Sequence, residues 1–174
     1  ISTYKSDFFT SRVFASIYQE LRAQGHKISK IEKLEQFTGG EYNYSPFLAG
    51  VAATTFVVLY GGHSIVLAER SEYITSEQRK WHYSMDEGFT QTDYEEGKPS
   101  FIKCFWRGLK EELNIDDVQS LSEPPKFMDL VFHRNVFELE FTSLFYYPKS
   151  FEDFKANYNR AKDRHLETYG LYEV

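Results

Sequence analysis

The stretch CFWRGLKEELNI, residues 104–115, combines a hydrophobic stripe with small and charged residues. A helix through it, wound at about 100° per residue, places these apolar residues on one side: Ile102, Phe105, Trp106, Leu109 and Leu113. The other side carries Cys104, Gly108, Glu111 and Glu112. A glycine inside a helix costs about 1 kcal/mol relative to alanine. The pattern therefore predicts a helix in which a neighbour needs the bare backbone at Gly108, beside a pair of carboxylates.

The composition is that of a globular protein with a sizeable core. The chain has 174 residues, a size typical of one domain, and is 41% hydrophobic and 18% aromatic. The formal net charge of −6 argues against general nucleic-acid binding, which needs a basic face. Such a charge suits either a protein that holds cations on carboxylates or an ordinary acidic surface.

Cysteine content and hydropathy indicate the cellular compartment and whether the chain associates with a membrane. A single cysteine, Cys104, excludes an internal disulfide and fits a reducing compartment, so we expect a cytoplasmic protein. The longest apolar run, residues 47–60, is interrupted by Gly50 and is too short to span a bilayer, and no signal peptide is visible. We expect no membrane association. The chain opens on isoleucine and stops at GLYEV, which favours a piece of a longer polypeptide.

Periodicity and turn residues predict the order of elements. A helix is expected over residues 7–24, two strands around the Gly61-Gly62 turn, and a long connection over 71–100. A helix from about Pro99 to Leu113 follows, then strands within 128–148 and a helix over 150–165. This order predicts an α+β or α/β fold, a mixed sheet with helices packed on it. We expect residues 1–46 to form an N-terminal helical extension and residues 47–174 the main domain.

Residues 107–115, RGLKEELNI, resemble the box of the Nudix superfamily, G-x5-E-x7-R-E-U-x-E-E-x-G-U, where U is aliphatic. Arg107 stands at the box arginine and Leu109 at the aliphatic position, while Glu111 and Glu112 match the metal-binding pair. Asn114 replaces the last glycine, and asparagine also tolerates a left-handed helix end. In the family the box forms a loop-helix-loop between strands, so the resemblance implies a Nudix-like mixed sheet sandwiched by helices.

Two features depart from the box. Gly108 replaces the glutamate that directly follows the arginine, so one carboxylate of the family's metal cluster is absent. Counting back from Arg107 puts the box glutamate on Pro99 and the leading glycine on Asp93, and neither matches. Glu87-Gly88 lies further upstream and would correspond through a longer insertion.

The resemblance implies a divalent cation, Mg²⁺ or Mn²⁺, held by Glu111 and Glu112. Hard cations of this kind prefer oxygen ligands. Glu87 is our first choice for a substitute third ligand. Arg107 is expected to brace a glutamate and Gly108 to be structural. The alternative is a solvated helix face, in which Arg107 and Glu111 form an ordinary i,i+4 pair.

The resemblance also implies residues that contact the substrate or the water. Arg70, at the end of a predicted strand, is expected to bind a substrate phosphate, for which a bidentate guanidinium is suited. Glu167 is expected to act as a late general base, with Asp163 as the second choice. The alternative is that Glu167 and Asp163 are ordinary charged residues near the end of a helix, with no function.

Three functions remain open at this point. The first is cation-dependent hydrolysis of a nucleoside diphosphate linked to another moiety, by a pyrophosphatase of the Nudix type. The second is a catalytically inactive Nudix-fold domain that senses a nucleotide-like small molecule or binds a protein within a larger polypeptide. The third is an unrelated α+β binding domain. The sequence leaves the substrate and the oligomeric state, including a homodimer, undetermined.

Overall fold

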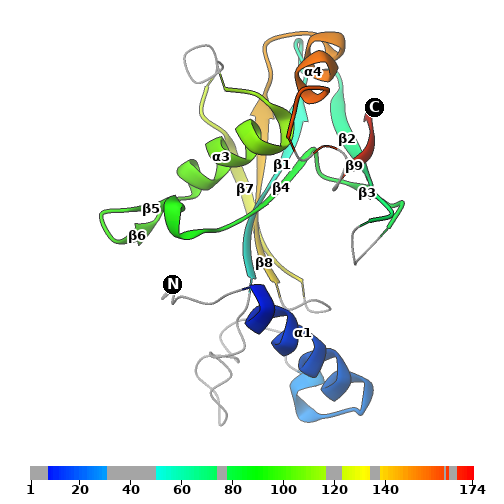
Figure 1. Cartoon of the computed structure of the whole chain (residues 1–174), viewed down its shortest axis with the longest axis vertical. Helices are drawn as coiled ribbons and strands as arrows, with labels where there is room; N and C mark the ends of the chain where they lie inside the picture. The colour runs from blue at the N-terminus through cyan, green and yellow to red at the C-terminus, as the bar shows by residue number, and fades with distance from the viewer. Residues whose placement is uncertain are drawn as a thin grey trace. The chain divides into compact units, whose positions relative to one another are not determined.

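The structure is a computed structural model and describes residues 8–30, 50–73, 78–116, 123–133, 138–162, 164 and 168–174. Figure 1 labels the helices and strands. The helices are α1 (Phe8–Ala23), α3 (Phe101–Leu113) and α4 (Phe151–Tyr158), with 3-10 turns η1 (Lys27–Lys30) and η3 (Gln91–Asp93). The strands are β1 (Gly50–Val58), β2 (Ile65–Arg70), β3 (Trp81–His82), β4 (Met85–Gly88), β5 (Tyr94–Glu95), β6 (Lys98–Pro99), β7 (Lys126–His133), β8 (Glu138–Tyr146) and β9 (Thr168–Glu173).

Most of these strands belong to one sheet. Within the described residues it has seven strands in the order β3-β2-β1-β8-β7, with β4 also paired to β1 and β9 also paired to β2. β1 and β2 are antiparallel, with Val57 opposite Val66. The turn between them has positive φ at Gly61 and Gly62, +91° and +69°, a conformation that glycine adopts at little cost. The predicted hairpin with a glycine turn is therefore confirmed.

The chain divides into two compact units. Unit 1 comprises Ile1–Ala52 and Leu130–Glu140, and unit 2 comprises Ala53–Asp129 and Phe141–Val174. Unit 1 contains α1, which ends before Gly25 as predicted; its predicted cap, Asp7, lies outside the described residues. The predicted boundary between residues 46 and 47 stays a prediction. The residues discussed below belong to unit 2.

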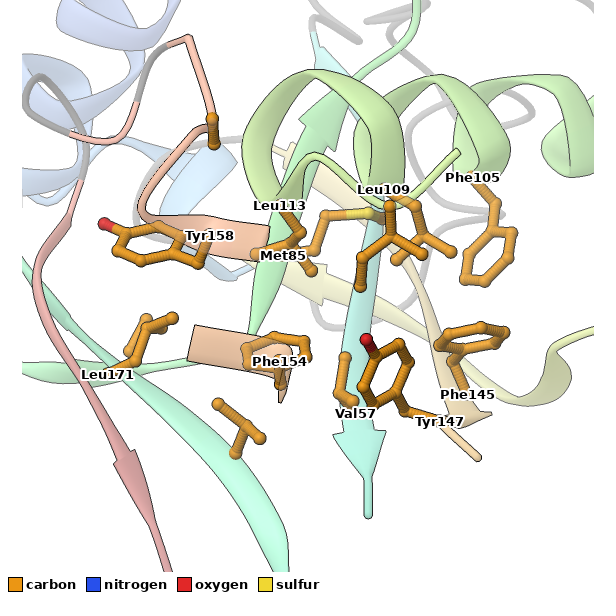
Figure 2. Packing of buried hydrophobic residues seen from close by; sticks show 14 of the residues in the cluster. Val57, Met85, Phe105, Leu109, Leu113, Phe145, Tyr147, Phe154, Tyr158 and Leu171 are labelled. Atoms are coloured by element: carbon orange, nitrogen blue, oxygen red, sulfur yellow. The ribbon is translucent and has the colours of Figure 1, made fainter. Parts of the chain in front are cut away.

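The core of unit 2 is built around α3. Ser100 caps this helix, since its Oγ accepts a hydrogen bond from Lys103 N at 3.4 Å. Asn114 ends the helix in the left-handed conformation (φ 53°, ψ 40°) that the sequence allows. The buried apolar residues include Phe105, Leu109 and Leu113 of α3. Figure 2 shows these side chains directed into a cluster with residues of β1, β4 and α4.

A neighbour packs against the bare backbone at Gly108, as the helical pattern predicted. Cys104 and Gly108, on the small-residue side, are buried against β4, whereas Ile102 of the apolar stripe is 39% exposed. A Cβ at position 108 would lie 2.7 Å from Glu87 Cβ and 2.7 Å from Met85 Sδ. Atoms do not approach that closely, so α3 can rest on β4 only because residue 108 has no side chain (Figure 1).

Two predicted elements differ in extent. The connection over 71–100 contains β3, β4, η3 and the β5–β6 hairpin, whose strands of two to four residues are too short to show a period. The last predicted helix stops at Tyr158 instead of reaching residue 165, because the chain turns at Asn159 and Arg160. None of the helices in the described ranges combines the length and the apolar character needed to cross a membrane.

The contact between α3 and β4 makes a prediction for Gly108→Ala. Alanine gains about 1 kcal/mol of helix propensity, but overpacking against the Glu87 stem costs about 1–3 kcal/mol. We expect a net loss of stability and a melting temperature lower by a few degrees, measured by thermal unfolding. Gly88→Ala is the control, because a Cβ there meets no atom within 4 Å. An unchanged or higher melting temperature for Gly108→Ala would contradict this packing.

Candidate functional site

The guanidinium of Arg107 gathers three carboxylates from three segments, here called the arginine cluster: Arg107, Asp93, Glu87 and Glu111. Arg107 Nε donates to Asp93 Oδ1 at 3.0 Å and Nη2 donates to Asp93 Oδ2 at 2.8 Å, a bidentate pair. Nη1 lies 2.8 Å from Glu87 Oε1 and 3.1 Å from Glu111 Oε2. Nη2 also donates to the Gly88 carbonyl oxygen at 2.6 Å. Three carboxylates around one cation leave the cluster with an excess of negative charge.

Asp93 is the buried anchor of this cluster, with only 1% of its surface exposed. Thr90 N donates to Asp93 Oδ2 at 2.8 Å, as does Thr90 Oγ1 at 3.2 Å. Burial by itself raises the pKa of Asp93, but the hydrogen bonds from Arg107 and Thr90 outweigh it and hold the pKa below its usual value. The pKa of Arg107 is correspondingly raised, chiefly by its hydrogen bonds to Asp93. The pair is thus charged throughout the neutral range.

Leaving the β5–β6 hairpin out of the count changes which residues fall at the leading glycine and the first glutamate of the Nudix box. Thirteen residues separate Asp93 from Arg107, and the hairpin, residues 94–99, takes up six of them. The remaining seven equal the E-x7-R spacing, which favours Asp93 as the counterpart of the box glutamate. Gly88 then stands near the leading glycine, with four intervening residues in place of five. Counting along the uninterrupted sequence includes the hairpin and therefore reaches Pro99 and Asp93 instead.

A sequence signal for this hairpin was present at Glu96-Gly97. Both residues have positive φ, +50° and +77°, as a two-residue hairpin turn requires. The paired strands hold only two residues each, Tyr94 opposite Pro99 and Glu95 opposite Lys98. Runs this short carry no alternation, so only the glycine marks the turn.

Glu112 points to a different place from Glu111. Its Oε2 accepts a hydrogen bond from Asp86 N at 3.2 Å, which fixes the last turn of α3 against β4. Glu112 also lines a cavity of about 90 Å³, here called the polar pocket, with Ala68, Arg70, His82, Tyr83, Ser84, Asp86 and Thr168. This volume holds several water molecules but is well below the roughly 300 Å³ of a site that encloses a whole small molecule. The polar pocket therefore suits the charged end of a ligand.

Arg70 supplies the positive charge of the polar pocket. Its Nη1 lies 2.9 Å from His82 Nε2 and donates to Asp86 Oδ2 at 3.3 Å. Its Nε is buried and has no hydrogen-bond partner among the described residues. A buried donor without a partner costs about 1–3 kcal/mol. That donor is available to a ligand anion.

The carboxylates fit a hard divalent cation in kind, since all are oxygen donors. Within the described residues, however, no three histidine, cysteine, aspartate or glutamate side chains are gathered closely enough to hold a metal ion. Glu87 and Glu111 both pair with Arg107 Nη1, while Glu112 lies against Asp86. Glu111 is 48% exposed, and an exposed i,i+4 pair is worth only a few tenths of a kcal/mol. Turning Glu111 away from Arg107 thus costs little.

The predicted site residues fall into three groups. Arg70 and Glu112 come together in the polar pocket, and Glu87, Glu111 and Arg107 come together in the arginine cluster. Glu167 and its alternative Asp163 lie outside the described residues, so the predicted general base has no position here.

Sequence patterns alone do not identify His82 and Asp86 as neighbours of Arg70, or Asp93 as the partner of Arg107. Ala68 pairs with His82, a register that puts His82 on the same face as Arg70. Only this pairing identifies the histidine as a neighbour of the arginine. The lone thiol, Cys104, is buried, which raises its pKa and makes it unreactive.

No known family profile matches the sequence, and no curated protein matches it. Solved structures do match in three dimensions. DR0079 from Deinococcus radiodurans aligns over 72% of this chain and 67% of its own, with a TM-score of 0.52 and 12% identity. The chain has the Nudix fold, an α+β fold, which confirms the fold class predicted from residues 107–115.

Two further structures have lower scores. A mutT/nudix family protein from Listeria innocua has a TM-score of 0.48 and 12% identity, covering 72% of this chain and 77% of its own. A bifunctional NMN adenylyltransferase/ADP ribose pyrophosphatase from Francisella tularensis, complexed with AMP and a Mn ion, has a TM-score of 0.45 and 13% identity. That alignment covers 94% of this chain and 39% of the other.

The Asp93–Arg107 pair predicts an acid limb of stability. Because the folded-state pKa of Asp93 is depressed, its contribution is complete above the ordinary carboxyl pKa of about 4 and is lost as the pH falls through the folded value. Asp93→Asn should cost about 3 kcal/mol near pH 7. Its difference from wild type should shrink below about pH 4, as measured by denaturant unfolding from pH 3 to 7.

The matched control is Asp116→Asn. Asp116 is 53% exposed and pairs with Lys110 at 3.0 Å on the surface, so its loss should cost under about 1 kcal/mol. A constant difference between wild type and Asp93→Asn down to pH 3 would contradict the role given to Asp93.

Proposed function

We propose that this chain binds a nucleoside diphosphate linked to another moiety and hydrolyses the pyrophosphate bond with the help of Mg²⁺ or Mn²⁺. The observation that carries the proposal is the meeting of Arg70 and Glu112 in the polar pocket. These residues come from the end of β2 and the last turn of α3. A ligand anion in the pocket would meet the Arg70 guanidinium directly and the Glu112 carboxylate through a bound cation. The Nudix fold and the match at residues 107–115 support the same reaction.

The cation would be held by Glu112 and Glu111 of α3, with Glu87 of β4 as the third carboxylate. The stem of Glu87 occupies the space that a side chain at position 108 would fill. The carboxylate that the box lacks on the helix is thereby supplied from the neighbouring strand. A bound divalent cation neutralises phosphate charge and lowers the pKa of a coordinated water. Arg107 pairs with both Glu87 and Glu111 and so holds these two carboxylates near each other.

Arg70 binds the phosphate. Its buried Nε donates to a phosphate oxygen, and this bond satisfies a donor that otherwise has no partner among the described residues. The small volume of the polar pocket admits the diphosphate end, and the rest of the ligand stays outside. Glu167 remains our candidate for the general base. The single cysteine leads us to place this reaction in the cytoplasm.

The second candidate function is a catalytically inactive sensor of the same ligand class. Two observations favour it: residue 108 carries no carboxylate, and Arg107 pairs with both Glu87 and Glu111. If these ion pairs hold, a ligand occupies the polar pocket without being cleaved. A sensor of this kind would act as a module of a larger protein or as a homodimer.

Hydrolysis separates the two functions. Purified chain is incubated with a panel of nucleoside diphosphate derivatives in Mg²⁺ or Mn²⁺. Each cleavage yields two phosphomonoesters, which are measured by chromatography or as the phosphate that an added phosphatase frees from them. We expect cleavage of at least one compound, reduced about a hundredfold or more by Glu112→Gln. Removing the cation with a chelator should abolish it.

The control is Glu123→Gln, an exposed carboxylate that follows α3 in the sequence and contacts neither the polar pocket nor the arginine cluster. It should retain full activity. If wild type forms no more phosphomonoester product than Glu112→Gln, the hydrolase proposal fails. Binding of the same compounds by calorimetry then supports the sensor.

A further inference from the structure

An arginine whose guanidinium plane is already fixed loses less rotamer entropy when it binds an oxyanion. The side chain otherwise carries about 2 kcal/mol of rotamer entropy, which the ligand has to offset. Arg70 stands at the end of β2, where pairing with β9 is irregular. Backbone hydrogen bonds tie it to the other neighbour: Arg70 N donates to Lys80 O at 2.9 Å, and Arg79 N donates to Arg70 O at 3.1 Å. Residues 79 and 80, which precede β3, are thus held beside Arg70 by backbone hydrogen bonds.

This pairing brings His82 to the guanidinium. Ala68 is opposite His82, so the histidine lies on the face of the sheet that carries Ala68 and Arg70. His82 Nε2 lies 2.9 Å from Arg70 Nη1, and because an arginine can only donate, the ring nitrogen accepts. Asp86 Oδ2 accepts from the same Nη1 at 3.3 Å. Nη1 therefore donates its hydrogen bonds to protein groups, whereas Nε has no partner among the described residues and is available to a ligand in the polar pocket.

The histidine and the aspartate are themselves held in place. The His82 ring makes an edge contact with Tyr83, 4.8 Å between centroids, and its side chain is only 14% exposed. Ser84, which lies between His82 and Asp86 in the sequence, forms hydrogen bonds with β1 and β2. Its Oγ donates to Val66 O at 2.5 Å and accepts from Val57 N at 2.8 Å. The segment 82–86 thus forms a fixed support beside Arg70.

We propose that His82, with Asp86, is a positioning residue that sets the guanidinium plane of Arg70 so that its Nε faces the ligand. The inference rests on the proposed function of the polar pocket. His82 also lines the polar pocket, but the role assigned to it here is exerted through Nη1 of Arg70. Of the two supports, His82 gives the cleaner test, because replacing Asp86 also removes a negative charge next to the anion and changes the affinity by that route as well.

The first measurement is the affinity for inorganic pyrophosphate in Mg²⁺, by calorimetry on the full chain. His82→Ala should weaken binding about tenfold, the effect of losing one hydrogen bond to a charged group. His82→Gln keeps an acceptor oxygen and should restore most of the affinity. Glu69→Gln is the control: Glu69 precedes Arg70 on β2 but pairs with Arg79 and Tyr172. It should bind like wild type. A His82→Gln variant as weak as His82→Ala would count against positioning.

The second measurement needs no ligand. Rotation about the Nε–Cζ bond of each arginine is followed by NMR of the guanidinium nitrogens, with Arg107 as an internal reference because its contacts are untouched. Rotation at Arg70 should be slow in wild type and His82→Gln and fast in His82→Ala. Equally slow rotation in His82→Ala overturns the inference, whatever the affinity. A wild type that shows slow rotation but binds no pyrophosphate overturns the proposed function and leaves the positioning role standing.

Discussion

The ion pair between Arg107 and Asp93 is the contact on which the rest of the site depends. It joins α3 to the turn before the β5–β6 hairpin, and the same guanidinium reaches Glu87 of β4 and Glu111 one helical turn along. Asp93 is buried and receives further hydrogen bonds from Thr90, so the guanidinium has a fixed orientation. Two of the three carboxylates proposed to hold a cation, Glu87 and Glu111, are therefore placed by a cation of the protein itself. Without a metal ion, this arrangement also limits their mutual repulsion.

The packing of β4 explains why a glycine lies inside α3 at position 108. The missing side chain lets β4 lie directly on α3, and Glu87 and Met85 fill the space. A glutamate at this position would have to displace that strand. The glycine in the helix and the close packing of β4 therefore belong together, because Glu87 and Met85 occupy the space that a side chain at position 108 would need.

The sequence predicts the parts of the site that lie on one continuous helix. The resemblance of residues 107–115 to the Nudix box picks out the arginine and the carboxylate pair, and helical periodicity places them on one helix. The structure confirms that this helix ends at Asn114. The roles of Asp93, His82 and Asp86 depend on contacts between segments that no local pattern encodes. Asp93 meets Arg107 only after a hairpin is looped out, and His82 meets Arg70 only through strand register. Strands of two residues are too short to show an alternating pattern in the sequence. Neither the Asp93–Arg107 contact nor the His82–Arg70 contact could therefore be predicted within the connection over 71–100.

The central claim is that a divalent cation and a diphosphate meet between α3, Glu87 and Arg70. The most direct test is a crystal structure grown with Mn²⁺ and pyrophosphate, with the ion located by its anomalous signal. The account predicts Mn²⁺ bound to Glu112, with Glu111 turned away from Arg107, and a phosphate oxygen on Arg70 Nε. Pyrophosphate in the polar pocket with no ion on α3, and Glu111 still on Arg107, would contradict the cation site. An ion and a phosphate bound elsewhere would contradict the whole account.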